Sequence, residues 1–358
     1  MSFKHDVKMF LREAYARTLF HTGLWKLVDR LMPARLTILA GHCVAPGTVS
    51  EEGVLPADMQ ISAAKLERIL GWFKGRYALT TVGAGWSTLR AGHAKKSLVA
   101  LSMDDGYKDN AQVMLPLLRR VGAPATVYLE SRPLDERRVN WSHKYFWLCA
   151  RTDFTALVQR YGELTRDPPT QRALEKVLAE KRGDVRYHVK RVLKYDADPA
   201  DRERVIDALF VERGGDERAL CDTLYMDWDE ARELAAAGVE LGGHTVNHVI
   251  LSRCDRATAR TEIAEGGRSV RTALGQPTPS FAYPWGRRWD FTAETSALVV
   301  EAGFESAVTM HAGVNLPGSD PTRLKRLALA DDARLHLLAT EACGGFELLR
   351  KLGLDLSE

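Results

Sequence analysis

Two short polar segments of this sequence combine carboxylates with imidazoles, and each segment closes an apolar run. The first covers residues 102–107 and the second covers residues 242–248. Their side chains best suited to chemistry are Asp104, Asp105, His244 and His248. Two carboxylates and two imidazoles suit a catalytic divalent metal with a carboxylate base beside it. The sequence therefore predicts a metal-dependent hydrolase.

The adjacent carboxylates are expected to divide the work. Successive residues at a strand end point in different directions, so one side chain can face the metal and the other the attacking water. Asp105 would bind the metal, and Asp104 would take a proton from water. The alternative reading of this pair is a strand end whose Asp caps the following helix.

The two histidines are four residues apart, a spacing that suits one face of a helical turn. Gly242 and Gly243 precede them, and we expect these glycines to allow a sharp backbone turn. Thr245 lies between the histidines and is expected to support them by a hydrogen bond within the loop. Taken alone, such a histidine pair is a weak signal; beside the upstream Asp pair it becomes a strong one.

Strand-like and helical patterns alternate along most of the chain. The expected strands or strand ends cover residues 36–40, 98–103, 125–129, 239–241, 281–284, 306–309 and 324–329. The expected helices include residues 110–120, 257–274 and 292–302. This alternation implies parallel strands with helical crossovers, and one α/β barrel could use nearly the whole chain. The polar strand ends would then converge on one rim of the barrel.

Between about residues 135 and 223 the alternation stops, and the sequence becomes charge-rich and helical in period. We read this stretch as a helical insertion. The expected organisation is an N-terminal amphipathic helix at 1–34, a barrel at 35–130 and 226–332, the insertion at 131–225 and a C-terminal helix at 333–358.

Composition narrows the class of partner and compartment. The 50 Lys and Arg residues nearly balance 47 Asp and Glu residues, so the charge of +3 gives no reason to expect nucleic acid. The five cysteines are scattered and contain no C-x-x-C, which fits a reducing compartment. No stretch near the N-terminus resembles a signal peptide, so a cytoplasmic location is expected.

Residues 3–32 show helical periodicity with interleaved basic residues. A basic amphipathic helix can lie on an anionic membrane surface. Packing against its own domain is the commoner arrangement, and both readings stay open at this point.

Three motifs together carry a resemblance to a known family. They are Ser-Met-Asp-Asp-Gly-Tyr at 102–107, Gly-Gly-His-Thr-Val-Asn-His at 242–248 and Phe-Ala-Tyr-Pro-Trp-Gly at 281–286. In this order they resemble the NodB-like polysaccharide deacetylases, carbohydrate esterase family four. The likeness runs from about Leu36 to Leu329 and is interrupted by the helical insertion. It implies a distorted (β/α)7 barrel that hydrolyses an N-acyl group from an amino sugar.

The resemblance also implies roles for single residues. By motif position, Asp104 is the catalytic base. The implied ligands of a divalent metal, commonly zinc and sometimes cobalt, nickel or iron, are Asp105, His244 and His248. Pro284 and Trp285 match the third motif, where the backbone N–H after the proline helps to hold the oxyanion. Apart from the resemblance, four aromatic residues near the predicted rim are candidates to stack on sugar rings: Tyr107, Tyr283, Trp285 and Trp289. Packing in the core or at the rim is the alternative for each of them, above all for Tyr283.

The chain departs from the family pattern in the parts that complete the site. Ala282 stands where the family usually has an arginine that orients the base, and the later motifs that supply the general acid have no clear match. His42 and His311 are the candidates for that acid, and either is equally compatible with a neutral histidine at the barrel rim. Arg326 is a candidate to orient Asp104, with a purely structural salt bridge as the alternative.

We therefore predict a metal-dependent carbohydrate deacetylase that removes an acetyl or formyl group from an amino sugar. The expected substrate is a glycan or a lipid-linked or nucleotide-linked saccharide. The alternatives are hydrolysis of a non-sugar amide on the same metal site and a non-catalytic sugar-binding pseudoenzyme.

Overall fold

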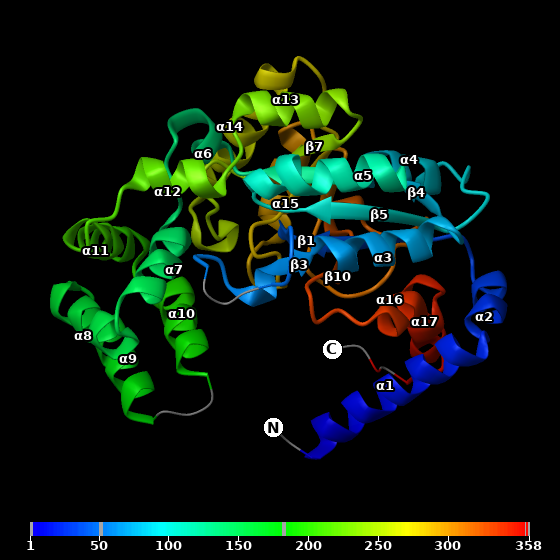
Figure 1. Ribbon diagram of the computed structural model, residues 1–358, viewed down its shortest axis with the longest axis horizontal. Coiled ribbons are helices and arrows are strands. Elements are labelled where there is room, and N and C mark those ends of the chain that lie inside the picture. Colours follow the sequence, from blue (N-terminus) through cyan, green and yellow to red (C-terminus); the bar gives the residue numbers. More distant parts are fainter. Residues whose placement is uncertain (1–2, 50–52, 181–183, 355, 357–358) are drawn as a thin grey trace. The chain divides into compact units, whose positions relative to one another are not determined.

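A parallel sheet forms the centre of the computed structural model, which describes residues 3–49, 53–180, 184–354 and 356 (Figure 1). Its neighbouring strands follow the order β10–β1–β5–β6–β7–β8–β9. The short strand β4 is outside this order and pairs with β5. The strands of this sheet are β1 (Leu36–Gly41), β4 (Ala78–Thr80), β5 (Leu98–Met103), β6 (Thr126–Leu129), β7 (Glu240–Gly243), β8 (Ser280–Ala282), β9 (Ser306–Val308) and β10 (Leu327–Ala328). A separate parallel pair joins β2 (Cys43–Ala45) to β3 (Gln60–Ser62).

The segment around Arg326 closes the sheet into a barrel. Leu324 exchanges backbone hydrogen bonds with the end of β9, at 2.9 Å to the Ala307 carbonyl and 2.8 Å from the Thr309 amide. A few residues later, Leu327 of β10 pairs with Leu39 of β1. One segment thus bridges the two ends of the sheet, and the predicted distorted (β/α)7 barrel is confirmed.

Helices surround the barrel because its strands are buried on both faces. All six residues of β1 and all six of β5 are buried, which explains their unbroken apolar runs. The helices of this unit that cover or follow the strands are α3 (Ala63–Lys74), α4 (Val82–Arg90), α5 (Leu115–Val121), α6 (Ser131–Glu136), α13 (Trp228–Ala236), α14 (Arg256–Leu274) and α15 (Ala293–Glu301). Residues of α3, α5 and α13 share one apolar core cluster with β5, β6 and β7.

Turn chemistry sets several helix ends as the sequence indicates. Asp227 and Glu230 form a capping box at the start of α13. Gly122 ends α5 in the left-handed conformation. Ser62 precedes α3, but its hydroxyl donates to Asp331 Oδ1 at 2.7 Å instead of capping that helix.

Both terminal helices are interrupted, so the expectation of one continuous helix at each end is wrong. The N-terminal segment forms α1 (Phe3–Thr22) and α2 (Trp25–Leu31), with Gly23 between them at a φ of 78°. The C-terminal segment forms α16 (Leu335–Ala342) and α17 (Gly345–Lys351), separated by Gly344 at a φ of 81°. A positive φ is readily adopted by glycine and cannot continue an α-helix. The predicted helix at 110–120 likewise begins with a π-helical turn, Asn110–Met114.

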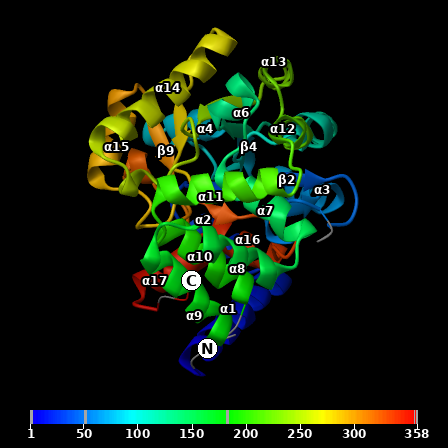
Figure 2. The same cartoon turned by 90° about the vertical axis from the view of Figure 1, so that its left-hand side faces the viewer.

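A second compact unit comprises the described residues of Arg137–Thr223 and of Ser50–Pro56. Its helices, green in Figures 1 and 2, are α7 (Trp141–Arg151), α8 (Phe154–Leu164), α9 (Pro168–Glu180), α10 (Val185–Tyr195), α11 (Pro199–Glu212) and most of α12 (Glu217–Leu224). Within this unit α7 packs on α11, and α9 packs on both α8 and α10. Their buried apolar faces form a core that includes Tyr145, Leu157, Leu174 and Leu209.

In the part of the chain that the structure describes, every helix is too short or too polar to cross a lipid bilayer.

Candidate functional site

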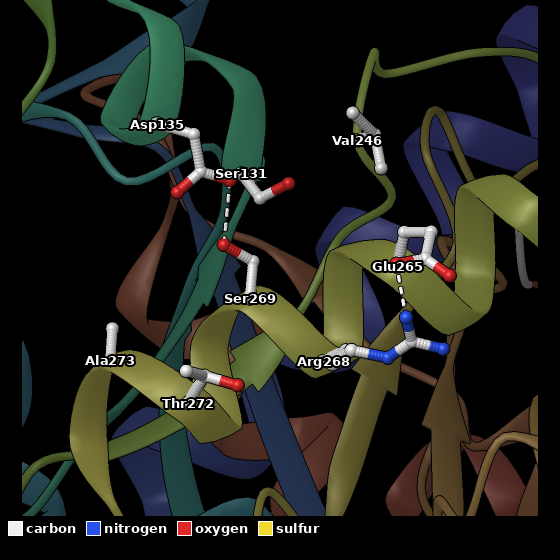
Figure 3. Close-up of a pocket in the computed structure, with 8 residues that line it drawn as sticks. All are labelled: Ser131, Asp135, Val246, Glu265, Arg268, Ser269, Thr272 and Ala273. Carbon is white, nitrogen blue, oxygen red and sulfur yellow. Dashed lines mark hydrogen bonds and ion pairs between the residues drawn. The ribbon is translucent and has the colours of Figure 1, made fainter.

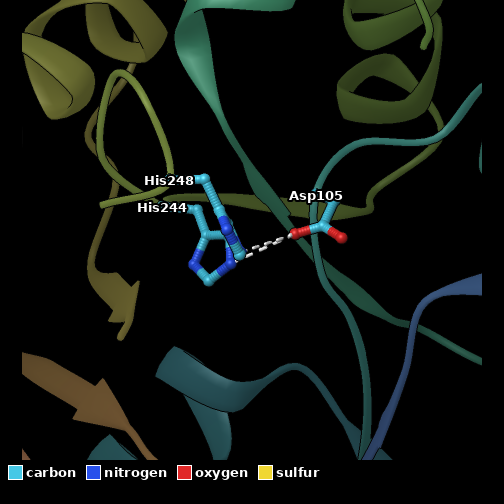
Figure 4. A group of neighbouring side chains, drawn as sticks. All are labelled: Asp105, His244 and His248. Atoms are coloured by element: carbon cyan, nitrogen blue, oxygen red, sulfur yellow. Dashed lines mark ion pairs between the residues drawn. The ribbon is translucent and has the colours of Figure 1, made fainter. Parts of the chain in front are cut away.

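The carboxyl ends of β5 and β7 place the carboxylates and the imidazoles together (Figure 4). In the sheet these two strands are separated only by β6. Three side chains offer one ligand atom each, and these atoms all lie within 4.8 Å of one another: Asp105, His244 and His248. The two segments singled out in the sequence are therefore adjacent in the fold.

Two imidazole nitrogens face one carboxylate oxygen. Asp105 Oδ1 lies 3.3 Å from His244 Nε2 and 3.3 Å from His248 Nε2. Neither contact has hydrogen-bond geometry, and among the described residues this buried oxygen has no hydrogen-bond partner. A buried carboxylate oxygen without a donor is costly unless a cation or a proton meets it. The donor set, two nitrogens and one oxygen, fits a divalent metal with open positions.

The hydrogen bond on the far side of His244 fixes its tautomer. Its Nδ1 lies 2.7 Å from the Ala282 carbonyl oxygen, which can only accept, so Nδ1 carries the proton. In the neutral ring, Nε2 then keeps its lone pair and points toward Asp105. This arrangement is typical of histidines that bind metals through Nε2.

Four residues at this site have a left-handed backbone. They are Asp105, Thr245, His248 and Trp285, with φ angles of 73°, 66°, 53° and 64°. In the described residues only one other non-glycine residue, Arg137, has a positive φ. Such conformations cost roughly 1–3 kcal/mol each and cluster at functional sites. The backbone strain of the barrel is thus concentrated around the candidate site.

Asp104 has a different partner from Asp105. The Arg326 guanidinium donates a hydrogen bond to each of its oxygens, from Nη1 to Oδ1 at 2.7 Å and from Nη2 to Oδ2 at 2.7 Å. Burial raises the pKa of Asp104, but the adjacent Arg326 outweighs burial and holds that pKa below its usual range. Arg326 is itself fully buried and also donates to the Thr309 carbonyl at 2.9 Å. The two carboxylates are equally buried, yet one faces a guanidinium and the other faces two imidazoles.

A tyrosine pair holds the loop that carries Asp105. Tyr107 is hydrogen-bonded to Asp105 and stacks on Tyr225, with ring centroids 5.4 Å apart. The Tyr225 hydroxyl donates to the buried Glu130 at 3.1 Å, just past the end of β6. The Tyr107 ring has no exposed surface, which leaves no face for a sugar. The expected substrate contact of Tyr107 is therefore wrong in this structure; it supports Asp105 instead.

Glu262 of α14 holds the loop that carries the two histidines. Its carboxylate accepts the backbone N–H groups of Val246 at 3.0 Å and Asn247 at 2.8 Å, and the Asn247 side chain at 2.6 Å. Arg132 completes this clamp by donating to Asn247 Oδ1 at 2.9 Å. Glu262 could not be identified from the sequence, because an isolated Glu in a predicted helix carries no sign of a loop partner.

Thr245 links the two histidines from inside the loop. Its hydroxyl donates to the His244 carbonyl at 2.5 Å and accepts the His248 backbone N–H at 3.0 Å. Gly242 and Gly243 do not make the sharp turn expected of them, since both are strand residues of β7. They are glycines because a Cβ would lie 2.5 Å from the Tyr128 ring at Gly242 and 2.7 Å from the Phe304 ring at Gly243.

The third motif lies against the histidines. The Trp285 ring is 5.0 Å from the His248 ring between centroids. Pro284 is buried, and its carbonyl accepts the Gly286 N–H at 2.7 Å, which forms a tight turn around Trp285. Trp285 is half-buried, so part of its surface remains available to a ligand.

The two candidate acids lie in different surroundings. His42 acts electrostatically on Asp104 and Asp105, lowering the pKa of both, which places it near the pair. Asn110 Nδ2 fixes its backbone carbonyl at 2.9 Å. His311 instead neighbours Phe291, at 5.9 Å between ring centroids. Burial and the cations Lys325, Arg323 and Arg288 lower the pKa of His311.

A separate pocket lies between α6 and α14 (Figure 3). Ser269 of α14 donates to Asp135 of α6 at 2.6 Å across it, and Val246 of the histidine loop forms part of its wall. The remaining lining residues are Ser131, Glu265, Arg268, Thr272 and Ala273. None of the four predicted metal-site or base residues lines this pocket.

Comparisons with known proteins agree with the geometry. Residues 194–307 match the family model described as polysaccharide deacetylase. This region contains both histidines of the site, whereas Asp104 and Asp105 lie outside it. No curated protein matches the chain by sequence.

Solved deacetylase structures have a similar fold. The deacetylase PplD of Streptococcus pyogenes, in complex with acetate, has a TM-score of 0.56 and 16% identity over 87% of this chain and 99% of that chain. IcaB from Ammonifex degensii has a TM-score of 0.54 and 17% identity, covering 87% of this chain and 98% of its own. A de-N-acetylase from Aggregatibacter actinomycetemcomitans has a TM-score of 0.54 and 16% identity, with 84% and 97% covered. The family match over residues 194–307 and this shared fold confirm the resemblance to the NodB-like polysaccharide deacetylases.

Proposed function

We propose that this protein is a metal-dependent hydrolase that removes an N-acyl group, most simply acetyl, from an amino sugar. The observation that carries the proposal is the convergence of Asp105, His244 and His248 beside an ionised Asp104 at one strand-end rim. The family description and the deacetylases of similar fold support the acyl group and the sugar.

The ligand set supports a divalent metal, with zinc as the proposed ion and cobalt, nickel or iron as alternatives. Asp105 Oδ1 supplies a buried oxygen without a hydrogen-bond partner in the described structure, and His244 Nε2 supplies a free lone pair. When bound, such a metal polarises the amide carbonyl and acidifies a water molecule. The remaining residues have to orient the substrate and move protons.

Asp104 is proposed as the base. A base must be ionised before it can accept a proton, and the Arg326 pair holds the pKa of Asp104 below its usual range. Because the guanidinium binds both oxygens, it also fixes the orientation of the carboxylate. Arg326 would thus replace the arginine that the family usually has at the position of Ala282.

Trp285 is proposed to stabilise the oxyanion through its backbone N–H. Its φ of 64° and the tight turn from Pro284 to Gly286 define the direction of that group. A preorganised N–H donor aimed at developing charge is a large contributor to such reactions.

The leaving amine needs a proton, and His42 is the better-supported donor. Its electrostatic effect on Asp104 and Asp105 places it near the reacting centre. Burial and three nearby cations lower the pKa of His311, which disfavours the protonated form that a general acid needs. A His42→Gln variant should lose far more activity than His311→Gln.

The substrate class is proposed as an amino-sugar-containing glycan or a lipid-linked or nucleotide-linked saccharide. The distinguishing assay measures acetate release from polymeric and from small or lipid-linked N-acetylhexosamine compounds. Release from polymer alone would reject the small-substrate proposal while leaving the deacetylase chemistry intact.

The decisive experiment measures metal content of the purified protein and acetate release before and after chelation. We expect one metal per chain and a chelator-sensitive release that returns when the metal is restored. Asp104→Asn should lower turnover by about 10²–10⁴-fold while bound metal is retained. Bound metal without release would favour another amide as substrate; neither metal nor release would favour a sugar-binding pseudoenzyme.

A further inference from the structure

Exposed large apolar side chains gather on the two terminal segments of the chain. In the described residues, eight of the twelve such side chains lie there, each at least 41% exposed. They are Val7, Phe10 and Leu11 of α1, Leu24, Leu27 and Leu31 of or beside α2, and Leu352 and Leu354 after α17. The elements that carry them are neighbours, since α2 contacts both α1 and α17, and exposed apolar side chains that gather in one region mark a candidate interaction site. We call these eight residues the terminal apolar set.

Helix α2 is apolar on more than one side. Trp25 and Val28 are buried in a small core with Leu19 and Cys343. Leu24, Leu27 and Leu31 recur at helical spacing and stay exposed, with Leu31 at 74%. Lys26, Asp29 and Arg30 lie between these apolar residues. A helix that combines exposed leucines with charged residues is suited to lie at an interface between water and an apolar phase.

On α1 the exposed apolar side chains also follow helical spacing. Val7, Phe10 and Leu11 stand at i, i+3 and i+4, and Phe10 is 70% exposed. Helix α1 packs on α16 (Figure 1). Ala16 and Leu19, on the side of α1 opposite to these exposed residues, are buried. Both helices are thus fixed to the barrel unit by one side and exposed by the other.

The charges beside these leucines are basic. Lys26 and Arg30 of α2 and Lys351 at the end of α17 are exposed. Two acidic residues of α1 and α2 pair within the fold, Glu13 with Arg17 and Asp29 with Arg35. An apolar surface that carries these exposed basic side chains is complementary to anionic lipid headgroups over an acyl layer.

An aromatic cluster flanks the same surface. The Trp25 and Trp72 rings lie 5.3 Å apart, and the Arg76 guanidinium stands 4.5 Å from the Trp72 ring centroid. Tryptophans with an adjacent cation suit the interface between headgroups and acyl chains. This cluster anchors α2 on α3 and keeps its leucines in place.

We propose that the terminal apolar set, with Lys26, Arg30 and Lys351, docks the protein on the surface of an anionic lipid bilayer. The helices lie on the membrane and do not cross it, in keeping with their length and polarity. This inference is independent of the catalytic proposal because it uses none of the residues of the candidate site.

The test uses the full chain and vesicle flotation. Vesicles of phosphatidylcholine alone are compared with vesicles that also contain phosphatidylglycerol, at low and at high salt. We expect the protein to float with the anionic vesicles, to stay unbound with phosphatidylcholine, and to be released by salt. Leu27→Asp and Phe10→Asp should each weaken binding roughly tenfold or more, since each replaces an apolar side chain with a negative charge that anionic lipid headgroups repel.

Val300→Asp is the matched control, because Val300 is 56% exposed on α15 of the same unit and outside the terminal apolar set. Circular dichroism and thermal melting verify folding, and Leu27→Ser replaces any Asp variant that fails to fold. The double variant Lys26→Glu/Arg30→Glu should lower both the affinity for anionic vesicles and the sensitivity of binding to salt.

Absence of flotation with anionic vesicles would overturn the proposal, as would equal effects of Leu27→Asp and Val300→Asp. A dimer in light scattering that Leu27→Asp converts to monomer would also overturn it, by showing that a second copy covers this surface. Acetate release from a small soluble substrate should be unchanged in all these variants, which separates this test from that of the proposed function.

Discussion

The loop after β5 and the loop after β7 both build the candidate metal site, but they are held in different ways. The Asp loop depends on residues far along the chain: Arg326 binds Asp104 across 222 residues, and Tyr225 belongs to the segment before α13. The main anchor of the His loop is local, because Glu262 is only 15 residues from Asn247. The Asp loop is therefore correctly placed only when the barrel has closed, whereas the His loop is held by adjacent groups of α6, α14 and β8.

The contacts also differ in chemistry. The Asp loop is fixed through side chains, with a guanidinium that sets the charge of Asp104. The His loop is fixed through its backbone, by a carboxylate that receives two N–H groups. Damage to the first anchor should change both charge and position, and damage to the second should change position alone.

The largest effect is expected where both loops contribute equally. Asp105→Ala removes the ligand from one loop, and His248→Ala removes one from the other. Each variant should lose bound metal and reduce acetate release to background, because two remaining ligands hold a divalent ion poorly. Metal analysis with thermal melting checks this, and a variant that keeps one metal per chain would remove that residue from the ligand set.

The next effect tests the long-range anchor. Arg326→Gln leaves Asp104 buried without its cation, which should cost about 3–5 kcal/mol of unfolding free energy. Burial would then dominate and raise the pKa of Asp104, so the acid limb of the pH–rate profile should move to higher pH. The base has to be ionised, which fixes the sign of this shift.

Arg326→Lys separates charge from geometry. Lysine keeps the positive charge but cannot bind both carboxylate oxygens with one planar group. We expect it to restore most of the stability and the acid limb, with turnover still below that of the wild type. If Arg326→Gln leaves the pH–rate profile unchanged, Asp104 is not the base.

The third effect tests the local anchor. Glu262→Gln keeps the size of the side chain but removes its charge and exchanges one acceptor oxygen for a donor amide, so the two backbone N–H groups and Asn247 lose part of their partner. Metal affinity should fall about 10–100-fold, the range seen when groups that orient metal ligands are altered. The acid limb of the pH–rate profile should stay where it is, in contrast to Arg326→Gln.

Glu265→Gln on the same helix is the matched control. Glu265 is half-buried and pairs with Arg268 rather than with the loop. Its substitution should leave metal affinity unchanged. Equal losses in both variants would mean that α14 acts through helix stability and not through a contact with the His loop.

The residue that anchors the Asp loop could be predicted from the sequence, but the residue that anchors the His loop could not. Arg326 could be proposed because it lies on an expected strand of a barrel whose strand ends converge. Glu262 could not, because its partners are backbone N–H groups that no sequence pattern displays. The left-handed backbone at Thr245 and His248 was equally hidden, since neither residue is glycine and the strain is imposed by the surrounding structure.

At the level of the fold, long periodic runs were informative and isolated glycines were not. The apolar runs of β1 and β5 identified buried parallel strands, and the alternation implied the crossovers. Gly23 and Gly344 each interrupt a helix that periodicity alone would continue, because amphipathic spacing persists on both sides of the break. Gly242 and Gly243 looked like turn glycines, yet they are required by aromatic rings of neighbouring elements.

The smallest effect concerns the tyrosine support of the Asp loop. Tyr225→Phe keeps the stack on Tyr107 but removes the hydrogen bond to Glu130, which should cost about 1–3 kcal/mol because a buried carboxyl group loses a donor. Metal affinity should fall by less than in Glu262→Gln, because Tyr225 acts on Asp105 through Tyr107.

Tyr15→Phe is the matched control. It removes a hydrogen bond of the same length, 3.1 Å to the Gly345 carbonyl, which joins α1 to the start of α17. That variant should lower the melting temperature without changing metal affinity. A metal affinity that falls equally in both would show that the Asp loop responds to overall stability, and the proposed chain from Glu130 through the tyrosines to Asp105 would then have no specific role.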